Sequence, residues 1–416
     1  MLSIVTERDI VMNNHKKKLL LLGGSRYLLP VIKEAHALGC HVITCDYLPD
    51  NYAHRFSDEY HNVSIVDKEA VLSLAASLHI DGVMSFACDP GVVTGAYVAE
   101  KLGLPYGGSY ESVSILQDKG RFRRFLSENG FRVPVSGSYR TCSDALQDFG
   151  RFHFPVIIKP VDSAGSKGVR RADREEDLAA AIAHALAHSV SKQFIIEEFI
   201  EAKGFASDTE CFTVDGELRF TSFNNQYFDS RAENPYTPAG FTWPSHMSAE
   251  SQRELRGELQ RLLKLLDMKT TVYNIECREG TDGKAYLMEV SPRGGGNRLC
   301  EMLRYACGTD LIRSAVLAAL GEDPGKLADP VYDGFWAQVI LHSDEDGVFK
   351  RLAIAEDVRN NVIEEALWVQ PGEKIERFSG ANKSLGTVVL RFDSASEADA
   401  RMADIRSWLE IELQAE

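Results

Sequence analysis

Two acidic residues in the segment 271–293 are spaced so that they could share a metal ion. The segment reads TVYNIECREGTDGKAYLMEVSPR, two β-prone runs joined at Asp282-Gly283, a strong signal for a two-residue hairpin turn. With the turn centred there, Glu276 faces Glu289, and like charges directly opposite each other destabilise a hairpin. Mg²⁺ is commonly held by one or two carboxylates together with substrate phosphates, so a shared cation would explain the pair.

Side chains alternate along a strand, so the two acids should lie on one polar face of this hairpin. The same face is expected to carry Asn274, Arg278, Leu287, Ser291 and Arg293. The opposite face carries Ile275, Cys277, Met288 and Val290, which should pack against a core. The alternative is a surface hairpin whose acids point into water, and an isolated hairpin would usually be read that way.

Glycine-containing segments on both sides of the acid pair are suited to phosphate. Arg293 is followed by three glycines and a helix predicted to begin near Asn297, and a helix N-terminus with bare backbone N–H groups attracts anions. Upstream, FPVIIKPVDSAGSKGV places Lys159 at the end of a strand, and Lys167 adds a second charge. The loop that follows Lys159 contains Ser163, Gly165, Ser166 and Gly168. The GxxxxGK[ST] pattern of a P-loop is absent, and by itself this segment could be an exposed hairpin loop.

The elements that would position these residues begin with an alternating N-terminal unit. Residues 18–22 read as a strand, a Gly23-Gly24-Ser25 turn and a helix follow, and 41–45 is a second strand. A helix at 68–78 and a strand at 82–86 continue the alternation, which predicts a doubly wound parallel sheet. Asp46 lies where a ribose-binding acid would, but a full GxGxxG is absent, so the pattern argues against a dinucleotide site.

The middle of the chain reads as mixed helices and strands. Strands are predicted at 154–159 and 194–199, and a hairpin at 210–223 around Asp215-Gly216. Helices are predicted at 112–130, 175–188, 248–266, 297–320 and 396–413. Residues 224–247 are predicted to form a long irregular loop, and loops of that length are usually functional.

Composition narrows the class of protein. The chain has 416 residues, 44% hydrophobic and 26% charged, which fits two or three packed globular domains. A net charge of -15 argues against nucleic acid or an anionic membrane as a main partner. The eight cysteines form no CxxC pair, and the N-terminal MLSIVTERDIVMNNHKKK lacks the apolar stretch of a secretory signal. We therefore expect a cytoplasmic protein with reduced thiols.

Taken in order, these segments resemble the ATP-grasp superfamily, specifically its carboxylate-amine ligases of the L-amino-acid-ligase type. The resemblance covers about residues 18–415. It rests on Lys119 in LQDKGRFRRFL, Lys159 in VIIKPVDSAGSKGV, EEFI at 197–200, Glu276, and MEVSPRGGGN at 288–297. It implies a mixed α/β and α+β fold with four parts. These are a leader (1–17), an N-terminal α/β domain with a parallel sheet (18–111), an ATP-grasp domain (112–325, lid about 134–200) and a small α+β C-terminal domain (326–416).

The resemblance also implies the cofactors, ATP and Mg²⁺, with Mn²⁺ as an alternative metal. Lys119 and Lys159 would contact phosphates, and the loop with Ser163, Gly165, Ser166 and Gly168 would be the mobile lid. Glu197 would take the adenine amino group, the backbone of Phe199 and Ile200 would meet the ring edge, and Glu198 is a weaker nucleotide contact. Glu276 and Glu289 match the metal ligands. The third ligand is usually Asn, whereas this chain has Ser291 at that position.

The implied reaction is amide or peptide bond formation through an acyl phosphate, with release of ADP and phosphate. Arg293 and Lys159 are the candidate catalytic residues. The candidate substrate-binding residues are Arg293, Gly295, Gly296, Asn297 and Arg298, with Arg231 and His246 in the 224–247 segment. The partners would be a small carboxylate and an amine, and the family often forms dimers. Two alternatives stay open: a bicarbonate- or formate-activating enzyme of nucleotide biosynthesis, and a nucleotide-binding sensor without turnover. A dehydrogenase is a weaker one.

Overall fold

The N-terminal domain is a parallel sheet with helices on both faces. The computed structural model describes residues 16–163 and 165–414, so most of the predicted leader lies outside the described residues. The sheet has the order β3-β2-β1-β4, and each neighbouring pair is parallel. Its strands are β1 (Lys18–Leu22), β2 (His41–Cys45), β3 (Glu59–His61) and β4 (Gly82–Ser85). Its helices are α1 (Leu29–Ala37), α2 (Lys68–Leu78) and α3 (Asp89–Leu102).

Alternation along β1 explains why both faces of this sheet are covered. Leu19 and Leu21 pack with residues of α1, whereas Leu20 and Leu22 pack with residues of α2 and α3. A strand that is apolar on both faces is typical of a parallel sheet between two helical layers. The predicted doubly wound arrangement is confirmed.

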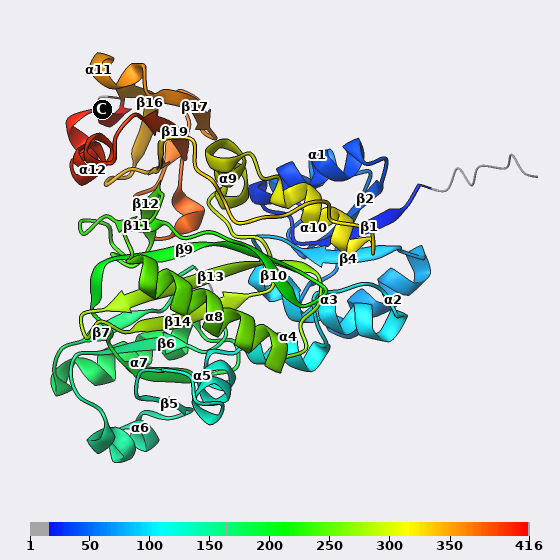
Figure 1. Ribbon diagram of the computed structural model, residues 1–416, viewed down its shortest axis with the longest axis horizontal. Coiled ribbons are helices and arrows are strands. Elements are labelled where there is room, and N and C mark those ends of the chain that lie inside the picture. The colour runs from blue at the N-terminus through cyan, green and yellow to red at the C-terminus, as the bar shows by residue number, and fades with distance from the viewer. Residues whose placement is uncertain (1–15, 164, 415–416) are drawn as a thin grey trace, which may run out of the picture.

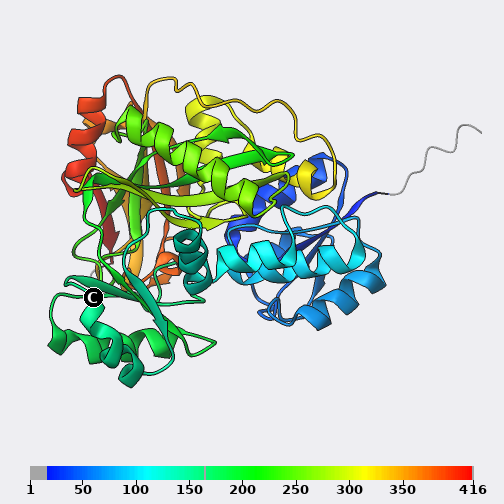
Figure 2. The ribbon, with the colours of Figure 1, turned by 60° about the horizontal axis from the view of Figure 1, so that its bottom comes forward.

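A four-stranded antiparallel sheet forms the predicted lid region. Its order is β5-β8-β6-β7, and its core includes Val156, Ile158, Phe194 and Ile196. The strands are β5 (Ser136–Tyr139), β6 (Val156–Pro160), β7 (Arg170–Ala172) and β8 (Phe194–Glu198). The helices before and within it are α4 (Tyr110–Gln117), α5 (Lys119–Glu128), α6 (Cys142–Asp148) and α7 (Glu175–His188). Figure 2 shows this unit below the large sheet.

A nine-stranded sheet is the main element of the molecule. Its order is β14-β13-β9-β11-β12-β15-β19-β17, and β10 pairs with β9. The first strands are β9 (Ala202–Val214), β10 (Glu217–Thr221), β11 (Asn225–Phe228), β12 (Pro238–Trp243), β13 (Thr271–Gly280) and β14 (Ala285–Ser291). The C-terminal part adds β15 (Phe335–Leu341), β17 (Val362–Leu367) and β19 (Gly386–Phe392). Its helices are α8 (Ala249–Leu265), α9 (Leu299–Cys307) and α10 (Leu311–Ala319).

The C-terminal part therefore adds three strands to the central sheet. The join is β12 with β15, where Phe241 pairs with Gln338 and Trp243 with Trp336. A small second sheet and two helices complete this part: β16 (Gly347–Ile354), β18 (Lys374–Ile375), β20 (Leu409–Leu413), α11 (Glu356–Arg359) and α12 (Ala395–Ala403). The boundary expected near 326 falls between strands of one sheet, and the division into domains stays a prediction.

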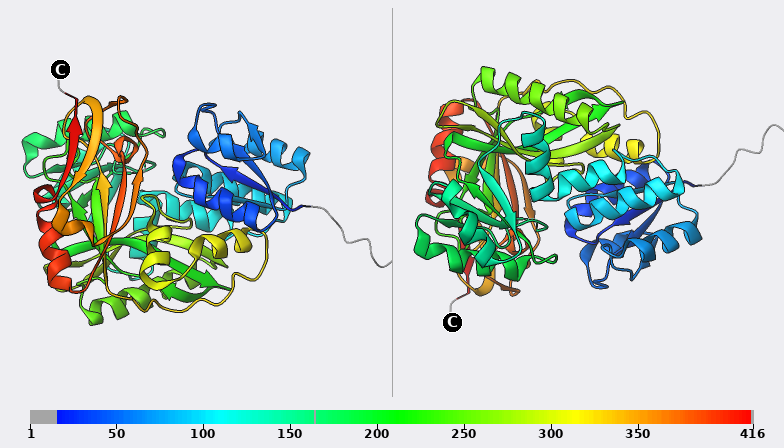
Figure 3. Two further views of the ribbon diagram at one scale, coloured as in Figure 1. Left: turned by 90° about the horizontal axis from the view of Figure 1, so that it is seen from above. Right: turned by 90° about the horizontal axis from the view of Figure 1, so that it is seen from below.

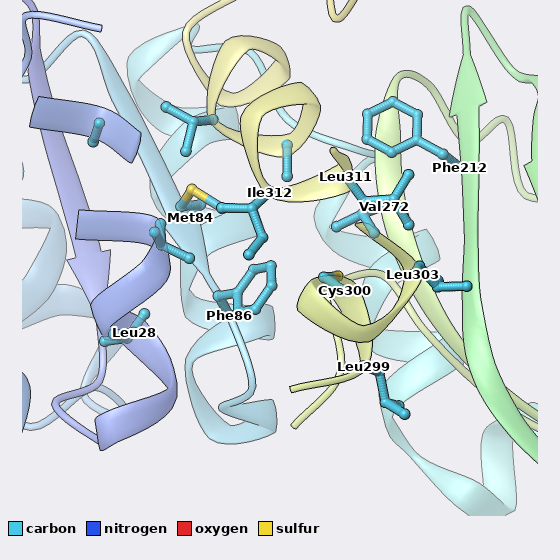
Figure 4. Close-up of a cluster of buried hydrophobic side chains, with 14 of the residues drawn as sticks. Leu28, Met84, Phe86, Phe212, Val272, Leu299, Cys300, Leu303, Leu311 and Ile312 are labelled. Carbon is cyan, nitrogen blue, oxygen red and sulfur yellow. The ribbon is translucent and has the colours of Figure 1, made fainter. Parts of the chain in front are cut away.

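The N-terminal domain and the C-terminal strands lie at opposite ends of the molecule (Figures 1 and 3). Between them, α9 and α10 pack on the N-terminal domain on one side and on the central sheet on the other. Figure 4 shows Met84 and Phe86 on one side of Ile312 and Cys300, with Phe212 and Val272 on the other. One continuous core thus fixes the N-terminal domain against the sheet. In the part of the chain that the structure describes, no helix is long and apolar enough to cross a bilayer.

Four of the predicted elements are corrected. The helix expected at 112–130 breaks at Asp118, whose extended backbone ends α4 and whose side chain accepts from the Arg121 N–H at the start of α5. The helix expected at 297–320 breaks after Cys307, where Gly308 adopts φ 73°. Residues 224–247 contain β11 and β12, because side-chain hydrogen bonds such as Asn225 Nδ2 to Thr242 Oγ1 stabilise a polar strand pair. The terminal helix ends at Ala403, and LEIEL, with period two, forms β20.

Candidate functional site

Glu276 lies opposite Glu289 in the β13–β14 hairpin, as predicted. The turn itself differs. The Gly280 N–H donates to the Lys284 carbonyl at 2.8 Å, which encloses a three-residue loop instead of a two-residue turn. A β-bulge then shifts the register between Glu276 and Cys277, so the one-residue difference disappears at the acids. The prediction for the acid pair is confirmed, although the register near the turn was wrong by one residue.

The bulge also exchanges two side chains between the faces of the hairpin. Leu287, expected beside the acids, lies in the core with Ile275 and Val290. Met288, expected in the core, lines a pocket with both acids. A bulge places two residues opposite one partner, which turns Met288 toward the polar face. These two face assignments are therefore corrected.

A third carboxylate continues the row on the neighbouring strand. In β9, Asp208 lies opposite Glu276, and Glu210 lies opposite Asn274. Asp208, Glu276 and Glu289 thus occupy one face of three adjacent strands, whose spacing is about 4.8 Å. Burial, with the Glu276 carboxylate next to it, raises the pKa of Asp208 to about 7. Sequence reasoning missed this acid, although two acids at alternate positions of a strand share a face.

Each of the two facing acids has a basic neighbour. Lys119 Nζ lies 3.2 Å from Glu289 Oε2 and donates to the Ser163 carbonyl at 3.0 Å. Arg278 Nη2 lies 3.0 Å from Glu276 Oε1. Two facing carboxylates that are each about one third exposed can still reach a hard cation. The donor set at this position fits Mg²⁺.

Glu197 is buried between two cations at the other side of the pocket. Its Oε2 is 2.7 Å from Lys159 Nζ and its Oε1 is 2.6 Å from Arg123 Nε. Burial alone would raise the pKa of Glu197, but Arg123 and Lys159 outweigh it and hold that pKa at about 2. Both oxygens are engaged, so the assignment of Glu197 to the adenine amino group stays a prediction.

Arg123 joins this ion-pair group to the bulge. Its Nη2 donates to the Met288 carbonyl at 2.8 Å and its Nη1 to the Leu287 carbonyl at 3.4 Å. Sequence reasoning did not single out Arg123, yet its i, i+4 spacing from Lys119 puts both on one face of α5. The pocket is lined by Leu116, Gln117, Lys119, Phe122, Arg123, Lys159, Glu197, Glu276, Met288 and Glu289. It brings both predicted phosphate lysines and both predicted metal acids together.

Arg293 is held by an acid from the N-terminal domain. Its Nε and Nη2 donate to the two carboxylate oxygens of Asp89 at 2.9 and 2.8 Å. Ser291 Oγ donates to the same carboxylate at 2.9 Å and accepts from Gln117 Nε2 at 2.7 Å. One lone pair of the Ser291 oxygen is left, so its assignment as the third metal ligand stays a prediction.

The predicted lid loop contacts the segment 229–237. Ser166 Oγ donates to the Tyr236 carbonyl, and Asn234 Nδ2 donates to the Ser166 carbonyl, both at 2.9 Å. Gly165 and Gly168 adopt φ 64° and 76°, a region that favours glycine. The loop therefore lies against a second loop of the large sheet.

The predicted adenine edge is engaged by protein groups. The Phe199 N–H donates to the Pro155 carbonyl at 2.9 Å, and the Ile200 carbonyl accepts from Arg278 Nη1 at 3.1 Å. Glu198 Oε1 accepts from the N–H of His153 at 2.9 Å. The nucleotide roles of these three residues stay predictions.

The glycine segment after Arg293 lies beside Glu210. The Gly295 N–H donates to Glu210 Oε1 at 2.8 Å, and the Asn297 carbonyl accepts from Gln338 Nε2 at 2.6 Å. Asn297 and Arg298 adopt positive φ just before α9 begins, with Gly296 preceding them. Glu301 and Glu364 flank the Arg298 guanidinium at 3.2 and 2.8 Å. Together with Arg293, five of the seven predicted substrate residues thus belong to one segment next to the acid row.

The other two predicted substrate residues pair with neighbours toward the C-terminal part. His246 Nε2 lies 3.4 Å from Asp399 Oδ1 in α12. Arg231, with a side chain 58% exposed, lies 3.8 Å from Asp229. Their assignment to substrate is not supported by a contact with the acid row and stays a prediction.

Three buried acceptor oxygens on the same face have no hydrogen-bond partner in the described residues. They are Glu210 Oε2, Gln226 Oε1 and Gln338 Oε1. Burial raises the pKa of Glu210 to about 8, with the Arg293 charge and the Gly295 N–H opposing that shift. Such orphaned acceptors cost free energy unless water or a ligand supplies a donor.

The chain is similar to several known proteins. Residues 152–301 match the family model of the ATP-grasp domain. The chain is 26% identical over 243 residues to the carbamoyl phosphate synthase large chain of Thermoanaerobacter sp. (strain X514), covering 56% of this chain and 21% of that one. It is 30% identical over 193 residues to the formate-dependent phosphoribosylglycinamide formyltransferase of Synechococcus sp. (strain CC9311), covering 46% and 49%. It thus spans about one fifth of the first curated relatives and half of the other.

Solved structures extend the likeness to the whole fold. The L-amino acid ligase from Bacillus licheniformis superposes with a TM-score of 0.79 at 21% identity, covering 96% of this chain and 99% of that one. At this identity the superposition establishes a common fold, including the N-terminal and C-terminal parts that lie outside the matched domain.

Proposed function

The chain belongs to the ATP-grasp superfamily of ligases, and from this premise we propose that it is an ATP- and Mg²⁺-dependent carboxylate-amine ligase. The product would be an amide or peptide bond made through an acyl phosphate, and the substrates a small carboxylate and a small amine in the cytoplasm. The single observation that carries the proposal is the facing pair Glu276 and Glu289, with Lys119 and Lys159 in the same pocket.

The residues of the pocket have separate tasks in this reaction. Glu276 and Glu289 would hold Mg²⁺, which when bound neutralises charge on the β and γ phosphates. Lys119 and Lys159 would contact the phosphates, and Arg293 would stabilise the negative charge on the transferring phosphoryl group. A substrate carboxylate oxygen bonds to the γ phosphorus as the bond to ADP breaks. The amine nitrogen then bonds to the acyl carbon, phosphate leaves, and the amine gives up one proton.

A hydroxylamine trap tests the acyl-phosphate step. With ATP, Mg²⁺ and the right carboxylate, hydroxylamine should capture the activated acyl group as a hydroxamate, with one ADP released per hydroxamate. Glu276→Gln should abolish both products, whereas Glu250→Gln, an exposed acid in α8, should leave them unchanged. ATP consumption without hydroxamate across a broad panel of acids would contradict the acyl phosphate.

The second candidate function is activation of bicarbonate or formate. The 30% identity to the formate-dependent formyltransferase favours it. ADP release with formate or bicarbonate, compared with release on a panel of amino acids and other carboxylates, separates the two. A sensor without turnover is the third candidate, because Ser291 stands where the family has Asn. It would bind one ATP and release no ADP on any of these acids.

A further inference from the structure

Asp89 reaches the site from a different part of the fold, 204 residues before Arg293 in the sequence. It is the first residue of α3, at the end of the N-terminal sheet. Three hydrogen bonds converge on its carboxylate, two from Arg293 and one from Ser291, at 2.8 to 2.9 Å. The Arg293 side chain is 8% exposed and the Asp89 side chain 17% exposed, so this is a mostly buried pair.

The backbone around Asp89 is fixed against the same segment. The Ala87 N–H donates to the Gly294 carbonyl at 2.9 Å. A Cβ on Gly294 would lie 2.2 Å from the Phe86 ring, so Gly294 is needed for this approach. Phe86 is itself part of the core between the N-terminal domain and α9 (Figure 4). Asp89 is therefore presented to Arg293 by a rigid support and not by a mobile surface loop.

The geometry of the pair is the one that an anionic substrate group would use. A guanidinium binds carboxylate or phosphate best through two parallel N–H donors, and Asp89 takes the Nε and Nη2 edge. The Nη1 group donates to the Gly294 carbonyl at 3.3 Å. An anion that approaches this bidentate edge of Arg293 must therefore compete with Asp89 for it.

We propose that Asp89 is a positioning residue that orients Arg293 and acts as its counter-ion until an anionic substrate group takes its place. Ser291 assists by donating its hydroxyl to Asp89, which gives this residue a role apart from the metal. The inference rests on the proposed function, which identifies the anion as the substrate carboxylate or the transferring phosphoryl group. Its consequence for binding can be measured without turnover.

Binding of inorganic phosphate to the full-length protein tests the counter-ion role. Asp89→Asn keeps the shape of the side chain but removes its charge, leaving Arg293 as a buried cation without its partner. Removing one member of a buried pair leaves an uncompensated charge, so phosphate should bind about tenfold more tightly or better. Isothermal titration calorimetry of the wild type and the variant measures this change.

Two further variants test whether Arg293 is responsible for the gain in phosphate affinity. In the double variant Asp89→Asn/Arg293→Gln, the gain in phosphate affinity should disappear. Asp67→Asn is the matched control: Asp67 caps α2 in the same domain, accepts from the Ala70 N–H, and lies outside the site. It should bind phosphate as the wild type does. Unchanged or weaker phosphate binding in Asp89→Asn, or a gain that survives in the double variant, overturns the proposal.

Ser291→Ala provides a second, milder perturbation. It removes one of the three donors that hold the Asp89 carboxylate beside Arg293. Phosphate should then displace Asp89 more easily, so phosphate affinity should rise, but less than in Asp89→Asn. If Asp89→Asn does not fold, as judged by thermal unfolding, this variant decides the question, and an unchanged affinity then overturns the proposal.

Kinetics then separate positioning from a purely structural role. In Asp89→Asn the turnover number should fall about tenfold or more while the KM for ATP changes little, because a misdirected Arg293 affects the transferring group. A structural role alone would lower the unfolding temperature without tightening phosphate binding. If the wild type consumes no ATP with any acid, the proposed ligase function fails, whereas the phosphate result still judges the counter-ion role.

Discussion

Lys159 and Glu197 form a buried ion pair, with Nζ 2.7 Å from Oε2, and Arg123 occupies the other oxygen of the same carboxylate. The pair joins two neighbouring strands of the lid sheet, since Lys159 lies in β6 and Glu197 in β8. Arg123 extends it to the carbonyls of the β14 bulge. The lid sheet, α5 and the β13–β14 hairpin are thus connected through one carboxylate.

Glu197→Gln should therefore destabilise the protein and weaken nucleotide binding together. Loss of the charge leaves Arg123 and Lys159 without their anion, which costs about 3–5 kcal/mol for a buried pair. Urea unfolding measures the loss of stability, and the KM for ATP should rise. Glu198→Gln is the matched control, because that neighbouring side chain is 26% exposed and lies beside His153. Equal effects of the two changes would contradict the central position given to Glu197.

Replacing the proposed metal ligands should affect catalysis more than folding. Glu276→Gln or Glu289→Gln should lower the turnover number about 100-fold or more, as expected when a major source of charge stabilisation is removed. Both variants should need more Mg²⁺ for half-maximal activity, and EDTA should inactivate the wild type reversibly. Asp208→Asn should shift the Mg²⁺ requirement less. A wild-type reaction that proceeds undiminished in EDTA would exclude the metal site.

Glu210 should make stability decline as the pH rises toward 8. Burial raises its pKa from 4.5 to about 8, so between those values the folded protein keeps a proton that the unfolded chain releases. The stabilisation is fully present below about pH 4.5 and is lost as the pH rises through 8. The free energy of unfolding in urea should differ less between pH 5 and pH 8 for Glu210→Gln than for the wild type.

The matched control for this experiment is Glu250→Gln. Glu250 is exposed in α8, so its pH dependence should follow that of the wild type. The opposite result is a free energy of unfolding of Glu210→Gln that follows the same pH dependence as that of the wild type and of Glu250→Gln. That result would mean that Glu210 is ionised in the folded protein from pH 5 to pH 8.

The contact between the lid loop and residues 229–237 should hold the loop closed and so protect it from proteases. Asn234→Ala removes the donor to the Ser166 carbonyl, so the loop should open more often. Trypsin should then cut sooner after Lys167, which is exposed in this loop. A non-hydrolysable ATP analogue with Mg²⁺ should slow the cut. Asn360→Ala, at an exposed position beside α11, is the control. An equal rate of cutting in the two variants would mean that the Asn234 contact does not restrain the loop.

Local patterns were sufficient for several helices. The bounds predicted for 68–78 and 175–188 agree with α2 and α7, because each segment has apolar residues at helical spacing. The strand pair β11 and β12 was missed because its polar residues are stabilised by partners on other strands. Intrinsic propensity is a weak guide where tertiary contacts decide.

The same distinction between local patterns and tertiary contacts applies to the candidate site. The turn signal predicted that Glu276 faces Glu289, but in the structure this pairing also depends on the bulge at Met288, which offsets the three-residue loop and could not be read from the sequence. Asp89 and Arg123 carry no local signal for their partners. Their contacts depend on how separate parts of the chain pack, which alternation and spacing within one element do not determine.

The sheet that continues from β12 into β15 has a consequence for any attempt to divide the protein. Cutting the chain before 326 would leave β12, now in the interior of the sheet, as an edge strand with unpaired backbone N–H and C=O groups. That edge would carry Phe241 and Trp243, both buried in the intact protein. Open apolar edges pair with other chains, so a shortened protein should self-associate instead of folding as a smaller ligase.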